Sequence, residues 1–153
     1  MKLVLIITGL STGGAEMMLL KLLDRLDPAR FSPQVISLTS LGEIGPRIQA
    51  LGIPVEALGM HPGRLPNPIA FARLVQRLKA IKPDVVQTWM YHADLVGGLA
   101  ARLVGVPAIA WNIRHSNRSP DQTKWSTRAV AHLCAKASRW IPDRIVCNSK
   151  TAR

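Results

Sequence analysis

Short apolar runs alternate with longer amphipathic stretches along the 153 residues of the chain. Six runs rich in β-branched and apolar residues predict strands: "KLVLIIT", "PQVISLT", "IPVEAL", "DVVQTW", "PAIAWNI" and "DRIVCNS". Between them, helical periodicity predicts helices near residues 14–26, 44–51, 67–82, 92–104 and 121–139. This alternation indicates an α/β fold, a doubly wound, Rossmann-like parallel sheet covered by helices on both faces.

Two predicted helices carry apolar stripes that need an interpretation. In the first helix, we expect a core stripe of Met18, Leu19, Leu22, Leu23 and Leu26. In the last helix, an apolar stripe adjoins a row of cationic positions; its members are Trp125, Ala129, Leu133, Ala137 and Trp140, beside Lys124, Arg128, His132 and Lys136. We favour packing of this stripe on the sheet with solvated cations outside. The alternative is a helix lying in a membrane interface with its cations at anionic lipid.

The charge balance indicates an anionic partner, because 20 Lys and Arg face only 9 Asp and Glu, a formal net charge of +11. Phosphorylated small molecules and acidic lipid headgroups fit this charge. We expect no nucleic-acid partner, since no recognition motif is present and only 5% of residues are aromatic. Cys134 and Cys147 lack metal-type spacing, so we expect no metal and a cytoplasmic chain with both thiols in the core.

The first predicted strand runs into the glycine-bearing turn "GLSTGG" and then a helix. Such a turn aims backbone N–H groups and the positive end of the helix dipole at the carboxyl edge of the sheet, where a phosphate can bind. Gly13 and Gly14 would let a ligand approach the backbone closely; alternatively they only form a tight turn. Ser11 interrupts the dinucleotide fingerprint, and no P-loop lysine follows. Glu16 falls in the first helical turn, where the dipole favours a carboxylate.

Two later loops bring further polar side chains to the same edge. One carries Tyr91 and His92 after the fourth strand, and the other carries His115 and Asn117 after the fifth. Ligands of open parallel sheets bind beyond the carboxyl ends of the strands. We therefore expect both histidines and the amides of the first turn to line one crevice, although a loop histidine is more often a solvated or helix-capping residue.

Four segments in this order resemble one family: "TGLSTGGAEMMLLKLL", "KPDVVQTWMYHADLVGGLAARLVGVP", "NIRHSN" and "DRIVCNS". They resemble the N-terminal, acceptor-side half of retaining GT-B glycosyltransferases of subfamily 4. The resemblance implies one half of a GT-B enzyme that transfers a hexosyl group from a nucleotide sugar to a glycan or lipid-linked acceptor. It implies no cofactor and no metal, and a role in bacterial envelope or capsule polysaccharide synthesis.

The resemblance also implies roles for individual residues. Gly13 and Gly14 would lie near the donor diphosphate, and His115 would be the catalytic residue beside the reacting sugar. The acceptor side would be formed by Tyr91, His92, Glu16 and Asn117.

Residues 1–153 are expected to form a single N-terminal domain. The chain stops four residues after Ser149, a predicted helix N-cap, so we expect a truncated protein without its C-terminal donor-binding domain, inactive by itself. We expect it in the cytoplasm, with peripheral attachment to the inner membrane face as a possibility raised by its charge. Two alternatives stay open: a non-catalytic α/β module that binds a phosphorylated ligand, and half of a GT-B sugar-nucleotide epimerase.

Overall fold

The computed structural model describes residues 1–61, 67–113 and 125–147. Its strands are β1 (Lys2–Ile7), β2 (Ser32–Ser37), β3 (Val55–Ala57), β4 (Val85–Trp89), β5 (Ala108–Ile113) and β6 (Arg144–Cys147). Its helices are α1 (Gly14–Asp24), α2 (Ile44–Gln49), α3 (Pro68–Ile81), α4 (Tyr91–Val104) and α5 (Trp125–Ala137). Every predicted strand and helix is present, with end points that differ by a few residues.

All strand pairings are parallel, and the strand order is β3-β2-β1-β4-β5-β6. The order reverses direction between β1 and β4, where the register pairs Ile7 with Trp89. The next pairing joins Trp89 to Asn112 at the end of β5. The predicted doubly wound sheet is therefore confirmed, and its switch point lies between β1 and β4.

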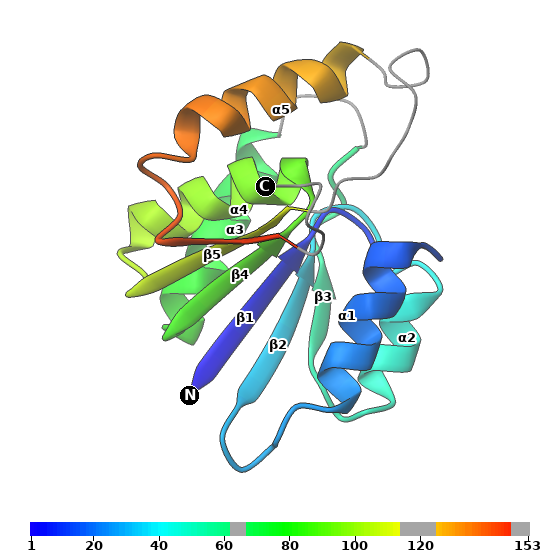
Figure 1. Ribbon diagram of the computed structural model, residues 1–153. Coiled ribbons are helices and arrows are strands. Elements are labelled where there is room, and N and C mark those ends of the chain that lie inside the picture. Colours follow the sequence, from blue (N-terminus) through cyan, green and yellow to red (C-terminus); the bar gives the residue numbers. More distant parts are fainter. Residues whose placement is uncertain (62–66, 114–124, 148–153) are drawn as a thin grey trace.

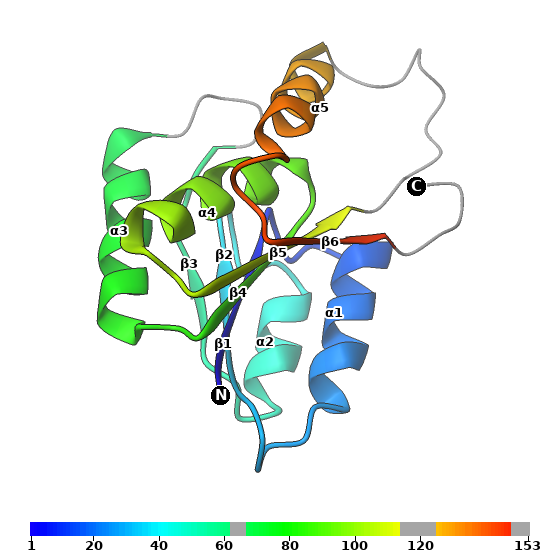
Figure 2. The same cartoon turned by 60° about the vertical axis from the view of Figure 1, so that its left-hand side comes forward.

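Helices cover both faces of the sheet (Figure 1). Figure 2 shows α1 and α2 on one side, and α3 and α4 on the other side with α5 packed on α4. Because successive side chains of a strand point to opposite faces, β1 feeds two cores. Leu5 and Ile7 belong to the core under α1 and α2, whereas Val4 and Ile6 belong to the core under α3 and α4.

The predicted core stripe of α1 is wrong at two positions. Met18 is 44% exposed and Leu22 is 37% exposed, whereas Leu19, Leu20 and Leu23 are buried. The helix is apolar over more of its circumference than the sheet covers, so periodicity alone could not select the buried side.

The predicted packing of Leu133 on the sheet is also wrong. Leu133 is 52% exposed and Trp140, just beyond α5, is 79% exposed. The inner face of α5 is instead formed by Val130, Cys134 and Ala137. The core position predicted for Cys134 is confirmed, while the side chains of Trp125, Arg128, Ala129 and Cys147, and all of Lys124, lie outside the described residues.

Two consecutive glycines let the backbone of α4 come close to side chains that cover the sheet. A Cβ added to Gly98 would lie 2.6 Å from Trp111 Nε1 and 2.7 Å from Ile141 Cγ2. A Cβ on Gly97 would lie 3.1 Å from side-chain carbons of Ile6 and Thr88. This close contact fixes the height of α4 above the strands and therefore the position of its first turn.

Candidate functional site

The loop after β1 is anchored by the loop that precedes α2. Thr39 Oγ1 donates a hydrogen bond to the Thr8 carbonyl at 2.9 Å, and the Ile44 N–H donates to the Leu10 carbonyl at 2.9 Å. Gly42 lies between them with a φ of +50°, and a Cβ there would collide with the Leu10 backbone. Gly42 is thus required by its conformation and by the lack of space, and it holds the loop at the edge of the sheet.

Gly13 is the N-cap of α1, and Gly14 is its first residue. Gly13 has an extended backbone, with φ −164° and ψ 172°, that any residue adopts. A Cβ on Gly14 would meet no atom within 4 Å. The space beside the Gly14 Cα is therefore open, at a helix N-terminus of the kind that can bind anions.

Glu16 brings a negative charge to that same turn. It occupies the third helical position, from which a glutamate can reach back to the N-cap. A Cβ on Gly13 would collide with the Glu16 carboxylate, so this carboxylate lies directly over the start of α1. An incoming phosphate and Glu16 would therefore compete for the positive end of the helix.

The turn after β4 is strained. Met90 has φ +74° and ψ 151°, a combination that residues other than glycine seldom adopt. It is the N-cap of α4, so Tyr91 and His92 follow directly at the start of that helix. Both side chains are half-buried, and burial lowers the pKa of the His92 imidazole below its ordinary value. His92 is therefore held as a neutral imidazole over more of the pH range than a solvated histidine.

The carboxyl edge also carries buried polar atoms that the sequence did not point to. Thr8 Oγ1 follows β1, Trp89 Nε1 ends β4, and Asn112 Oδ1 lies near the end of β5. None of them has a hydrogen-bond partner in the ranges that the structure describes. Such atoms are costly unless something satisfies them, and their position on neighbouring strand ends marks the same edge as the two loops.

The predicted residues therefore fall into two described groups and one undescribed group. Gly13, Gly14 and Glu16 start α1, and Tyr91 and His92 start α4. These helices follow β1 and β4, which are paired at the switch point, so both groups lie at one edge of the sheet. His115 and Asn117 lie outside the described residues, and the crevice that they were expected to share with Gly14 remains a prediction.

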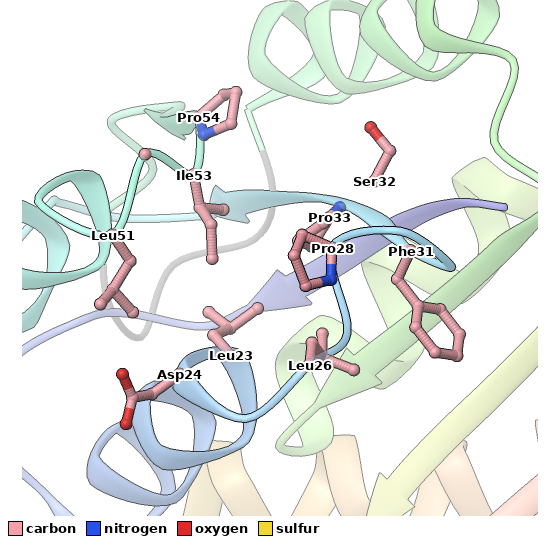
Figure 3. A pocket seen from close by; sticks show the side chains of 11 residues that line it. Leu23, Asp24, Leu26, Pro28, Phe31, Ser32, Pro33, Leu51, Ile53 and Pro54 are labelled. Carbon is pink, nitrogen blue, oxygen red and sulfur yellow. The ribbon is translucent and has the colours of Figure 1, made fainter.

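A pocket of about 440 Å³ lies at the opposite edge of the sheet (Figure 3). Figure 3 shows Leu23 and Leu26 from the end of α1, Phe31 before β2, and Ile53 before β3 around it. These residues adjoin the amino ends of β2 and β3, whereas ligands of this fold class bind at the carboxyl ends. We therefore place the functional site at the carboxyl edge and not in this pocket.

Neither a metal site nor a membrane-spanning helix is found among the described residues. No group of three His, Cys, Asp or Glu side chains is arranged to hold a metal ion in those ranges. Nor does any described helix have the length and apolarity to cross a membrane.

The sheet order, the switch-point loops and the helix N-termini define a Rossmann-like domain of the kind found in GT-B proteins. The sequence profile of Glycosyltransferase Family 4 matches residues 12–153. The chain belongs to this family, and its fold is that of the N-terminal GT-B domain. The resemblance seen in the sequence is thereby confirmed.

Solved structures with the same fold include glycosyltransferases and an epimerase. Alr3699/HepE from Anabaena, solved with UDP and glucose, has a TM-score of 0.71 and 21% identity, and the match covers 99% of the present chain and 39% of the Alr3699/HepE chain. MurG from Acinetobacter baumannii has a TM-score of 0.66 and 15% identity, and the match covers 99% of the present chain and 42% of the MurG chain. UDP-GlcNAc 2-epimerase from Methanocaldococcus jannaschii has a TM-score of 0.61 and 16% identity, and the match covers 99% of the present chain and 40% of the epimerase chain. The chain thus spans about two fifths of these proteins, and no curated protein matched it.

Proposed function

We propose that the chain is the acceptor-side domain of a retaining glycosyltransferase that uses a nucleotide-sugar donor. The observation that carries this proposal is the pairing of β1 with β4 at the switch point, which brings two helix N-termini to one edge in a chain of Glycosyltransferase Family 4. A hexosyl group would pass to a glycan or lipid-linked acceptor without a metal or cofactor. Bacterial envelope or capsule polysaccharide is the product class that we propose.

The proposed roles follow the two groups of residues. The first turn of α1, at Gly13 and Gly14, would add backbone N–H groups to the stabilisation of the leaving diphosphate. Tyr91 and His92 at the start of α4 would contact the acceptor, together with Glu16 and Asn117. A largely neutral His92 can accept or donate a hydrogen bond to a sugar hydroxyl.

His115 is the proposed catalytic residue, acting by a hydrogen bond that orients the donor sugar. The nucleotide pocket would lie in a second GT-B domain, so we expect residues 1–153 alone to bind acceptor without turnover.

The test is sugar transfer from UDP-glucose to a bacterial lipid extract by the longest form of the protein that its gene encodes. His115→Ala should lower turnover strongly with the fold retained, and His61→Ala, an exposed histidine, is the matched control. Unchanged turnover in His115→Ala would remove His115 from the site. Inverted anomeric configuration in the product would refute the retaining mechanism.

Peripheral attachment to an anionic membrane is part of the proposal, supported by the outer face of α5. Leu133 and Lys136 are exposed there, and Trp140, just beyond the end of α5, is exposed seven residues after Leu133. Leucine and lysine on a helix face, with a tryptophan just beyond the end of the helix, are suited to the boundary between lipid headgroups and acyl chains. The net charge of +11 adds attraction to acidic lipid.

Sedimentation with phosphatidylcholine vesicles, with and without phosphatidylglycerol, tests this attachment. Binding should require phosphatidylglycerol and weaken in Leu133→Ser and Trp140→Ser. Leu51→Ser, an exposed leucine beyond α2 on the other side of the sheet, should bind like the unaltered chain. Equal sedimentation with both vesicle types would refute the attachment.

A second candidate is half of a sugar-nucleotide epimerase, favoured by the similarity to two UDP-GlcNAc 2-epimerase structures with TM-scores of 0.61 and 0.60. Incubation with UDP-GlcNAc in the absence of acceptor separates the two functions. Formation of its C2 epimer would support the epimerase, whereas sugar transfer that requires an acceptor would support the transferase.

A further inference from the structure

A buried carboxyl lies directly behind the turn that carries the proposed acceptor residues. Asp94, in the first turn of α4, has no solvent exposure, and its Oδ1 accepts a hydrogen bond of 2.6 Å from Thr88 Oγ1 on β4. Its Oδ2 is buried and has no hydrogen-bond partner in the described part of the chain. Burying a half-satisfied carboxyl opposes folding, so this arrangement is not explained by stability alone.

The turn between β4 and α4 is held at three points. The Asp94 N–H donates to the Met90 carbonyl at 2.8 Å, which closes the turn on itself. The Thr88–Asp94 hydrogen bond attaches it to β4. On its outer side, the Cys134 thiol of α5 donates to the Tyr91 carbonyl at 3.2 Å.

Within this turn, Met90 keeps its unfavourable backbone conformation. A strained residue stays strained only when its surroundings hold it more strongly than relaxation would gain. Of the three attachments, the one through Asp94 joins the turn to a central strand of the sheet. Its loss would let Met90 relax and carry Tyr91 and His92 with it, because they are the next two residues.

We propose that Asp94 is a positioning residue of the acceptor site, which fixes Tyr91 and His92 through its hydrogen bond with Thr88. The role of the positioned residues rests on the function proposed above, whereas the positioning itself is independent of it. Asp94 does not contact the acceptor, since it is fully buried.

The pKa of His92, measured by NMR from its ring signals, reports the position of this turn. Burial lowers that pKa in the intact chain, so a displaced and more solvated ring should titrate closer to 6.5. The chain has four histidines, and loss of one signal in His92→Gln identifies the relevant one.

Two variants should raise the pKa of His92 toward its ordinary value. Asp94→Ala removes the acceptor of the hydrogen bond, and Thr88→Val removes the donor while keeping its shape. Asp94→Asn removes the titrating carboxyl but keeps the acceptor oxygen, so it should leave the pKa of His92 lowered. The matched control is Ser37→Ala, which deletes a buried hydroxyl of β2 that donates to the Ser40 carbonyl at 2.6 Å, within the segment that follows β2.

An unchanged His92 pKa in folded Thr88→Val would overturn the proposal, even if Asp94→Ala failed to fold. A change in Asp94→Asn equal to that in Asp94→Ala would also overturn it, because the effect would then come from loss of the carboxyl and not from loss of the hydrogen bond with Thr88. The measurement needs no substrate, so its outcome stands apart from failure of the transfer assay.

Discussion

Replacing Asp94 with asparagine should remove a pH dependence from the stability of the fold. Burial raises the pKa of the Asp94 carboxyl from 3.8 to about 7, and the hydrogen bond from Thr88 opposes this only in part. Between about pH 4 and pH 7, therefore, the folded state holds a proton that the unfolded state has lost. The stability contributed by this group is complete below about pH 4 and is lost as the pH rises through about 7.

The magnitude follows from the size of the shift. Each unit of pKa difference corresponds to ~1.4 kcal/mol, so a shift of about three units corresponds to roughly 4 kcal/mol in the free energy of unfolding. Cys134, the titratable group near Asp94 from α5, has a pKa raised to about 12 and stays a neutral thiol over this range. The lowered pKa of His92 acts in the opposite sense, because the unfolded chain then holds more protons and stability rises with pH up to about 6.5.

Urea unfolding followed by tryptophan fluorescence, at several values between about pH 5 and pH 8, measures this difference. The unaltered chain should lose about 1.4 kcal/mol per pH unit relative to Asp94→Asn at the acidic end, and the two curves should run parallel above about pH 8. The slope of the free energy of unfolding against pH is the quantity to compare, and not its absolute value. In Asp94→Asn the amide N–H groups replace Oδ2, which has no partner among the described residues, and this shifts the absolute stability. Asp24→Asn, at an exposed acid of α1, is the control. Parallel curves throughout the range would refute the reasoning.

Three further outcomes are expected. Gly98→Ala should destabilise the fold by about 1–3 kcal/mol in urea unfolding, because the new methyl group meets the Trp111 indole. Gly14→Ala, whose methyl group meets open space, should not destabilise it, and equal effects of the two substitutions would contradict the close contact at Gly98. Met90→Gly should be about 1 kcal/mol more stable than Met90→Ala, because both variants lose the side chain packed against the core under α1 and α2 and only glycine relieves the backbone strain; equal stability of the two variants would show that the φ of +74° is not strained. Glu16→Gln should strengthen binding of inorganic pyrophosphate about two- to five-fold in calorimetry, and unchanged binding would separate this carboxylate from the anion site.

The element pattern was predictable because strand and helix periods differ strongly. All six strands, β1 and β4 among them, could be placed from apolar and β-branched runs of a few residues. The orientation of α5 was not predictable, because Leu133 and Cys134 are adjacent and each belongs to an apolar stripe that could pack inward. Contact with α4 decided between them, and that contact depends on tertiary packing.

The site was predictable only in part. Gly13, Gly14 and His92 were placed at the carboxyl edge of the sheet from residue type and from their position after a strand, and their roles remain predictions. Asp94 was missed because an acid in the first turn of a helix is usually a solvated partner of the dipole, and its burial against Thr88 depends on the glycines further along α4. The strain at Met90 was missed for a similar reason, since nothing in the residue type indicates a positive φ.

The glycine pair of α4 has a consequence for engineering this domain. At Gly97 and Gly98, no side chain of the helix itself separates its backbone from the side chains of Ile6, Thr88 and Trp111 on the strands. The helix must then translate together with the strands as one body, so the turn at its start keeps its place when the outer surface is redesigned. Leu103, 63% exposed on the same helix, is a position where solubilising substitutions should leave that turn undisturbed.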